Sequence, residues 1–143
     1  MKAFIIALAF GVALPAVVLA GQKDHGVVPA ETLAWGPADA SGIRIAVLYG
    51  DPTQPGPVAV RVKVPAGVVL PSHAHSQDEF VTVLSGKAKV SWGMKTDPMS
   101  GEDLGSGSFF WMKAGEHHAL KAIDDLVLEL HPTTGPLDMI VDK

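Results

Sequence analysis

The sequence predicts an all-β fold, a sandwich or barrel of short strands preceded by a short irregular N-terminal arm. From Ile43 onward, runs of alternating apolar residues are separated by Gly, Pro and Asp, and no stretch carries helical periodicity. Val58, Val60, Val62 and Val64 alternate with polar or small residues in this way. Many short strands with turn signals between them are typical of sandwiches and barrels.

The length and composition predict one domain and exclude several kinds of site. A chain of 143 residues that is 48% hydrophobic can form one core. It contains no cysteine, which excludes disulfides, thiolate metal sites and cysteine nucleophiles. The formal charge of −4 argues against nucleic acid as a partner.

Residues 1–20 are typical of a secretory signal peptide. Lys2 precedes a long apolar stretch that ends in small residues at Ala20. Cleavage there would remove the charge of Lys2 and take the formal charge from −4 to −5. We therefore expect a periplasmic or secreted protein with no stable membrane anchor after cleavage. An uncleaved anchor is the alternative interpretation of the same pattern.

Two further segments follow this leader. Residues 21–41 are rich in Pro, Gly and Ala without sustained periodicity and are expected to form the N-terminal arm, which could pack through Leu33 and Trp35. Residues 42–143 are expected to form the β barrel.

Potential metal ligands lie close together between Gly67 and Gly86. His73 and His75 point the same way only on an extended strand, because side chains alternate there, and Glu79 follows four residues later. Imidazole nitrogen and carboxylate oxygen together suit Fe, Mn, Ni, Cu or Zn and disfavour a Mg or Ca cage of oxygens. We therefore expect one divalent metal ion of this group, held by residues of a sheet.

This stretch resembles the first motif of the cupin superfamily. That motif runs glycine, five residues, His-x-His, three residues, glutamate, six residues and glycine. The matching residues are Gly67, His73, His75, Glu79 and Gly86. The resemblance implies a double-stranded β-helix, or jelly roll, with the metal inside the barrel.

A second cupin motif is matched in part. Gly107, Gly115 and His118 stand at its glycine, glycine and histidine positions, whereas Lys113 replaces a proline and Ala122 replaces an asparagine. These two departures remove no ligand. The resemblance therefore implies that His118 is the fourth metal ligand.

Tight turns predict which residues share the face that carries the metal. A two-residue turn at residues 85–86 would set Trp92 beside Glu79. A turn at residues 113–116 would likewise set Trp111 beside the fourth ligand. The pocket-lining residues expected on this basis are Trp92, Trp111, Phe109, Val81 and Val83.

A third turn, at residues 124–125, would bring Glu129 and His131 onto the same face. There they would be candidate catalytic residues, able to orient a ligand histidine or to move a proton. A shift of one residue would instead turn Leu128 and Leu130 inward and send Glu129 and His131 to solvent. Both registers fit the sequence.

Two classes of function fit these observations. The first is a metal-dependent dioxygenase acting on a small enol, diketone or phenolic compound, as in cupins that share the four-ligand site. The second is a non-catalytic periplasmic module that binds or senses a metal or small ligand, because the stretch also resembles the cupin-like domain of zinc-dependent anti-sigma factors. In both classes the partner is a small molecule.

The face opposite the metal is more apolar than a solvated strand should be. It carries Phe80, Thr82 and Leu84 on one strand. A homodimer formed through this face is one interpretation. Cover by the N-terminal arm or by the partner sheet is the other.

Overall fold

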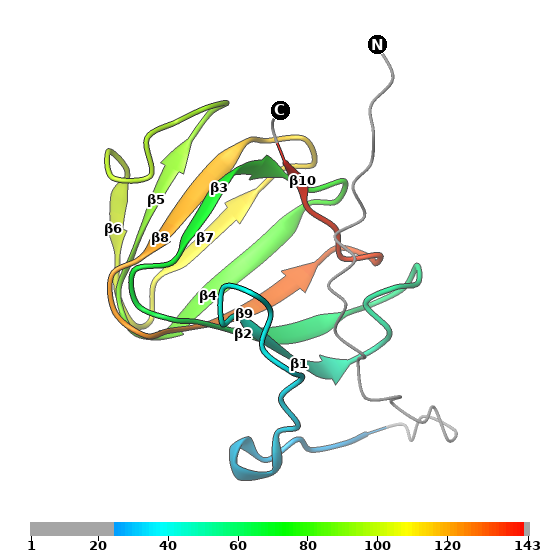
Figure 1. Cartoon of the computed structure of the whole chain (residues 1–143). Coiled ribbons are helices and arrows are strands. Elements are labelled where there is room, and N and C mark those ends of the chain that lie inside the picture. Colours follow the sequence, from blue (N-terminus) through cyan, green and yellow to red (C-terminus); the bar gives the residue numbers. More distant parts are fainter. Residues whose placement is uncertain (1–24, 142–143) are drawn as a thin grey trace.

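The computed structural model describes residues 25–141 of the chain. Within this range it contains one short 3₁₀ turn, Ala30–Thr32, and ten β-strands (Figure 1). The strands are β1 Arg44–Tyr49, β2 Ala59–Val64, β3 Val69–Ala74, β4 Glu79–Ser85, β5 Ala88–Trp92, β6 Glu102–Leu104, β7 Phe109–Met112, β8 His118–Ala122, β9 Leu126–Pro132 and β10 Ile140–Val141. The all-β prediction is confirmed.

The strands form two antiparallel sheets of five strands each. The first sheet has the order β1-β2-β9-β4-β7 and the second has the order β10-β3-β8-β5-β6. The sheets face each other and enclose the core between them (Figure 1). From β3 to β5, and again from β7 to β9, consecutive strands alternate between the sheets. This is the jelly-roll arrangement.

The core is built mainly from aliphatic residues on the inner faces of the two sheets. Val60 and Val83 are completely buried, and Val90 and Leu126 are nearly so. Side chains alternate along each strand, so Arg61 and Lys63 of β2 lie on the outer face while the valines between them point inward. Each fully buried aliphatic side chain contributes about 1.5–3 kcal/mol relative to an exposed one.

The predicted hairpins between consecutive strands are wrong. β4 and β5 lie in different sheets, as do β7 and β8, and β8 and β9. A turn signal specifies that the chain changes direction, but it does not specify which sheet the next strand joins. Gly86 shows why the first of these corners is tight. Its φ is 85°, and a Cβ there would collide with the backbone of Asp125, so the β4–β5 corner packs on the β8–β9 corner.

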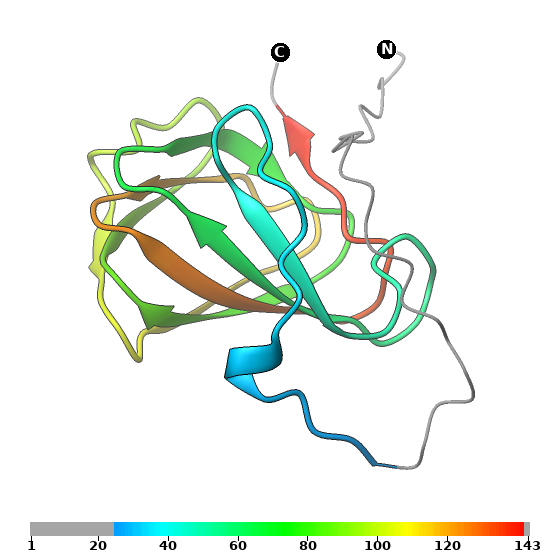
Figure 2. The ribbon, with the colours of Figure 1, turned by 60° about the horizontal axis from the view of Figure 1, so that its bottom comes forward.

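The N-terminal arm covers part of the outer face of the first sheet. Gly36 donates a backbone hydrogen bond to Ile45 on β1 at 2.8 Å. The ammonium group of Lys63 on β2 lies 4.2 Å from the centre of the Trp35 ring, which is a cation–π contact. Figure 2 shows this segment, coloured blue to cyan, running alongside β1. The arm therefore packs on β1 and β2 where Ile45 and Lys63 lie.

The predicted signal peptide, residues 1–20, lies outside the described residues, as does the start of the predicted arm. Between residues 25 and 141, no helix has the length and apolar character needed to span a membrane.

Candidate metal centre

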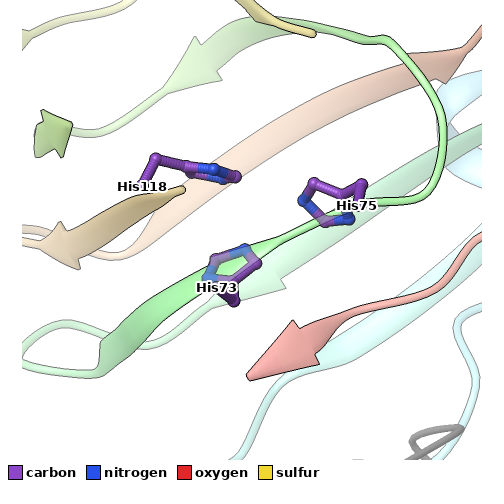
Figure 3. Close-up of side chains that lie close together, drawn as sticks. All are labelled: His73, His75 and His118. Carbon is purple, nitrogen blue, oxygen red and sulfur yellow. The ribbon is translucent and has the colours of Figure 1, made fainter. Parts of the chain in front are cut away.

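Three histidine side chains meet in the interior of the barrel. His73 lies on β3, His75 follows that strand directly, and His118 begins β8. Their ring centroids are 4.2 Å apart for His73 and His118, 5.0 Å for His73 and His75, and 5.3 Å for His75 and His118 (Figure 3). One nitrogen from each ring lies within 4.8 Å of the others, and all three residues are buried.

The register between β3 and β8 produces this meeting. His73 pairs directly with His118, whereas Leu70 pairs with Leu120, so β3 uses one more residue than β8 between these two pairs. The extra residue forms a β-bulge that includes Pro71, which has no backbone N–H to donate. Before the bulge an even-numbered residue, Leu70, faces the core. After the bulge, the odd-numbered residues His73 and His75 face the core.

Backbone carbonyl groups set the tautomer of each histidine. Nδ1 of His73 lies 2.7 Å from the carbonyl oxygen of Pro71, and Nδ1 of His118 lies 3.4 Å from that of Glu116. Nδ1 of His75 lies 2.5 Å from the carbonyl oxygen of Asp138. A carbonyl oxygen only accepts hydrogen bonds, so each Nδ1 carries a proton, and Nε2 is the nitrogen of each ring that is left to face a metal ion.

Glu79 reaches the cluster from the opposite sheet. It begins β4, is 2% exposed, and its Oε2 lies 3.1 Å from Nε2 of His75. Its Oε1 is buried and has no hydrogen-bond partner. Burial raises the pKa of this carboxyl group, and the charge of Asp138 adds to the effect, although His75 opposes it. A buried carboxylate oxygen without a partner is costly unless a cation compensates it.

The protonation state of His118 suits a metal ion. Burial is the main cause that lowers the pKa of His118 to about 3, and the neighbouring imidazoles of His73 and His75 act in the same direction. His118 is therefore neutral at physiological pH, as a metal ligand must be. Three imidazoles and one unpaired carboxylate oxygen fit a divalent ion such as Fe, Mn, Ni, Cu or Zn.

Trp92 lies beside this cluster, although its strand partner differs from the predicted one. It pairs with His118 on β8 rather than with Glu79, and its ring centroid lies 6.0 Å from that of His118. Its indole N–H donates to Glu102 at 3.3 Å. Trp92 is 38% exposed and borders a hollow of about 350 Å³. The residues that line the hollow are Val90, Ser91, Trp92, Thr96, Ser100, Gly101 and Glu102.

The predicted pocket residues on β4 point inward but belong to the core. Val81 is 2% exposed and Val83 is fully buried, and both pack within the main hydrophobic cluster. Neither lines the hollow beside Trp92.

The prediction that Phe109 and Trp111 face the metal is wrong. β7 pairs with β4, which places Phe109 opposite Thr82 and Trp111 opposite Phe80 on the outer face of the first sheet. Phe109 and Trp111 are 54% and 59% exposed. The ring of Phe109 stacks with those of Phe80 and Trp111, at centroid distances of 6.4 Å and 6.1 Å. The arm leaves these rings exposed, and a homodimer through this face stays a prediction.

The prediction that Glu129 and His131 face the cavity is also wrong. β9 lies in the first sheet between β2 and β4, so it does not pair with β8. Leu128 and Leu130 lie opposite Val83 and Val81 and take the inward positions, which is the alternative register.

On the outer face, Glu129 connects two basic groups. It accepts a hydrogen bond from Arg61 at 2.8 Å, and its other oxygen lies 3.0 Å from Nε2 of His131. This surface network lies on the side of the sheet away from the histidine cluster, so Glu129 and His131 have no catalytic part at the candidate metal centre.

The sequence did not predict the residues whose carbonyl oxygens accept hydrogen bonds from the histidine rings. Pro71 and Glu116 each lie two residues from the histidine they contact, whereas Asp138 lies 63 residues from His75. The contacts are made by main-chain carbonyl groups, which every residue carries. No signal in the sequence could therefore have identified them.

Comparison with known proteins places this geometry in a wider context. The family model described as the cupin domain matches residues 60–133. Among proteins of curated function, no significant match to the sequence was found.

Several solved structures have a similar fold. KdgF from a Halomonas species has a TM-score of 0.60 and 21% identity, over 75% of this chain and 94% of that one. A proposed acetylacetone dioxygenase from Methylibium petroleiphilum has a TM-score of 0.61 and 18% identity, over 80% of each chain. An uncharacterised double-stranded β-helix protein from Klebsiella pneumoniae has a TM-score of 0.64 and 16% identity, over 84% and 94%. At these identities the likeness shows the fold alone.

Replacing His75 should abolish stoichiometric metal binding. The His75→Ala protein loses one imidazole of the cluster, so we expect bound Zn²⁺ after loading and desalting to fall from about one equivalent to near zero. Elemental analysis measures the content. His131→Ala is the matched control, because His131 lies on the outer face and its removal should leave the content unchanged. Full occupancy in His75→Ala would refute the assigned ligand set.

The low pKa of buried His118 should make the free energy of unfolding depend on pH. The imidazole takes up a proton near pH 6.5 in the unfolded chain but only near pH 3 in the folded protein. The unfolded state therefore binds more protons between these values, and the free energy of unfolding falls as the pH is lowered, by up to about 1.4 kcal/mol per pH unit.

Urea denaturation of metal-free protein between about pH 6 and pH 4 measures this slope. The His118→Asn protein lacks the titrating group and should show a shallower slope. Glu79, whose pKa is raised, makes the free energy of unfolding rise as the pH is lowered. It is present in both proteins, so it does not account for a difference between their slopes. Equal slopes would contradict the buried neutral state of His118.

Proposed function

Because this chain belongs to the cupin domain family, we propose that it is a periplasmic or secreted metal-dependent dioxygenase of a small enol, diketone or phenolic compound. The observation that carries the proposal is the buried cluster of three imidazoles beside an unpaired carboxylate oxygen. The proposed location rests on the signal-peptide pattern of residues 1–20.

The chain's own residues have distinct parts in this proposal. His73, His75 and His118 would hold one divalent ion through Nε2, and Glu79 would add the carboxylate oxygen. When bound, such an ion would supply Lewis acidity toward an enolic oxygen and, if it is redox-active, reactivity with O₂. The single carboxylate compensates only part of the charge of a divalent ion, so the site favours an anionic oxygen donor such as an enolate or phenolate.

The hollow beside Trp92, which connects to the cluster through the contact of that ring with His118, supports a small, partly apolar substrate. The hollow of about 350 Å³ lies at the lower end of the range for small-molecule sites. Trp92 offers an indole face close to His118, while its N–H is held by Glu102. A lining that combines the Trp92 ring with Ser91, Thr96 and Ser100 suits a diketone or phenol better than a highly charged sugar phosphate.

One solved neighbour is consistent with this substrate class. The protein from Methylibium petroleiphilum is described as a proposed acetylacetone dioxygenase, and acetylacetone is a small diketone that forms an enol. At 18% identity this likeness supports the fold alone, so the diketone stays a proposal for the present chain.

A specific observation favours a second candidate function. The two groups expected to move protons beside the metal, Glu129 and His131, lie on the outer face instead. Among the predicted residues, this leaves Glu79 as the titratable carboxyl group beside the histidines. A centre with fewer acid–base groups suits a non-catalytic module that binds or senses a metal or small ligand.

Metal analysis combined with oxygen uptake separates the two functions. We expect protein purified without chelator to hold close to one equivalent of Fe, Mn or Cu, and to consume O₂ with acetylacetone or with a member of a catechol panel. The activity should be lost with chelator and in His75→Ala, and it should return when metal is restored to the unmodified protein. One equivalent of Zn with no turnover across the panel would refute the dioxygenase and support the binding module.

Trp92 should control substrate affinity without controlling the metal. For the diketone that is turned over, Trp92→Ala should raise KM roughly tenfold, which corresponds to about 1.4 kcal/mol. Its metal content should equal that of the unmodified protein, because Trp92 offers no ligand atom. Trp111→Ala removes an equally large ring from the outer face and serves as the control. An unchanged KM in Trp92→Ala would show that the substrate does not contact this ring.

A further inference from the structure

His75 differs from the other two histidines in how its ring is held. His73 and His118 each contact a carbonyl group two residues away on their own segment. His75 instead contacts Asp138, which comes from the other end of the chain. His75 also lies just beyond the last residue of β3, where its backbone carbonyl group accepts a hydrogen bond from Gly115 at 2.9 Å.

Asp138 contacts two consecutive residues of the ligand segment. Its backbone carbonyl oxygen lies 2.5 Å from Nδ1 of His75, and its side-chain Oδ1 accepts the backbone N–H of Ser76 at 2.9 Å. One residue thus holds both the imidazole ring and the backbone that carries it. The Asp138 carboxylate holds the backbone of residues 75–76 in place. The Asp138 carbonyl oxygen then meets Nδ1 of His75.

The segment around Asp138 is itself tied down on both sides. We define residues 133–141 as the C-terminal strap. Before Asp138, Gly135 donates to Gly56 and Leu137 donates to Pro52, each at 2.8 Å. After Asp138, β10 pairs with β3 through residues 140 and 141. Because both neighbouring parts of the strap are anchored, the position of Asp138 is set by the fold.

We propose that Asp138 is a positioning residue for the metal centre, which fixes the tautomer and orientation of His75 from the C-terminal strap. This inference rests on the proposed metal-binding function. It assigns to the strap a contribution to metal affinity, although none of its residues belongs to the predicted ligand set. Groups that orient a ligand histidine in this way typically change metal affinity 10- to 100-fold when they are removed.

Three variants test this assignment. Asp138→Ala removes the oxygen that accepts from Ser76, and Asp138→Asn keeps an oxygen in that place. Asp125→Ala is the matched control, because Asp125 also uses Oδ1 to accept a backbone N–H from a distant residue, that of Ala66 at 3.0 Å. Asp125 follows the end of β8 that is opposite His118, so its loss should not reach the histidine cluster.

Zn²⁺ affinity, measured by competition with a chromogenic chelator, is the first readout. Relative to the unmodified protein, we expect Asp138→Ala to bind Zn²⁺ roughly 10- to 100-fold more weakly, and both Asp138→Asn and Asp125→Ala to bind within about threefold. An unchanged affinity in Asp138→Ala would overturn the inference, as would an equal loss in Asp125→Ala.

The tautomer of His75 in metal-free protein is the second readout. Ring ¹⁵N chemical shifts, recorded where the imidazoles are neutral, should show a single Nδ1-protonated form in the unmodified protein and a mixture of forms in Asp138→Ala. A purely structural role for Asp138 would lower the melting temperature without changing the tautomer, and that result would overturn the inference.

The two readouts separate this inference from the proposed function. If the unmodified protein fails to bind Zn²⁺ or any other divalent ion, the metal-binding function is refuted while the tautomer still tests the contact with Asp138. If the unmodified protein binds metal and Asp138→Ala matches it in both readouts, only the role of Asp138 is refuted.

Discussion

The pairing of β3 with β8 is the interaction on which the candidate site depends. It sets His73 directly opposite His118, and the bulge at Pro71 brings the odd-numbered residues of β3 to the inner face. A strand without this extra residue would present Ser72 to the interior and turn both histidines of the His-x-His pair away from it. Hydrogen bonding between two strands therefore decides whether this sequence holds an internal cluster of imidazoles.

Burying that cluster has a cost that the rest of the barrel must offset. Three imidazoles and a carboxyl group lie in an interior that is otherwise mainly apolar, and each loses the hydration it would have at the surface. Carbonyl groups compensate the Nδ1 donors, but Oε1 of Glu79 keeps no partner. A bound cation would remove this penalty, so metal binding and folding stability should be coupled.

The interior faces of several strands could be read from the sequence because side chains alternate with period two. The inward valines of β2 and β4 follow that rule, and so does the common orientation of His73 and His75. Strand partners could not be read in the same way. The turn signals predict hairpins, whereas the chain crosses between sheets at these corners, so the predicted neighbours of Trp92, Trp111 and His131 are wrong.

The sequence by itself determined the all-β class, the inward faces of β2 and β4 and the chemistry of the candidate metal ligands, because these properties depend on local spacing and on side-chain type. Only the tertiary structure decided that Phe109, Trp111, Glu129 and His131 lie outside, and that Asp138 reaches His75. Those outcomes depend on which strands become neighbours and on main-chain groups that all residues share. Such contacts are selected by the packing of the whole barrel, so they leave no local pattern in the sequence.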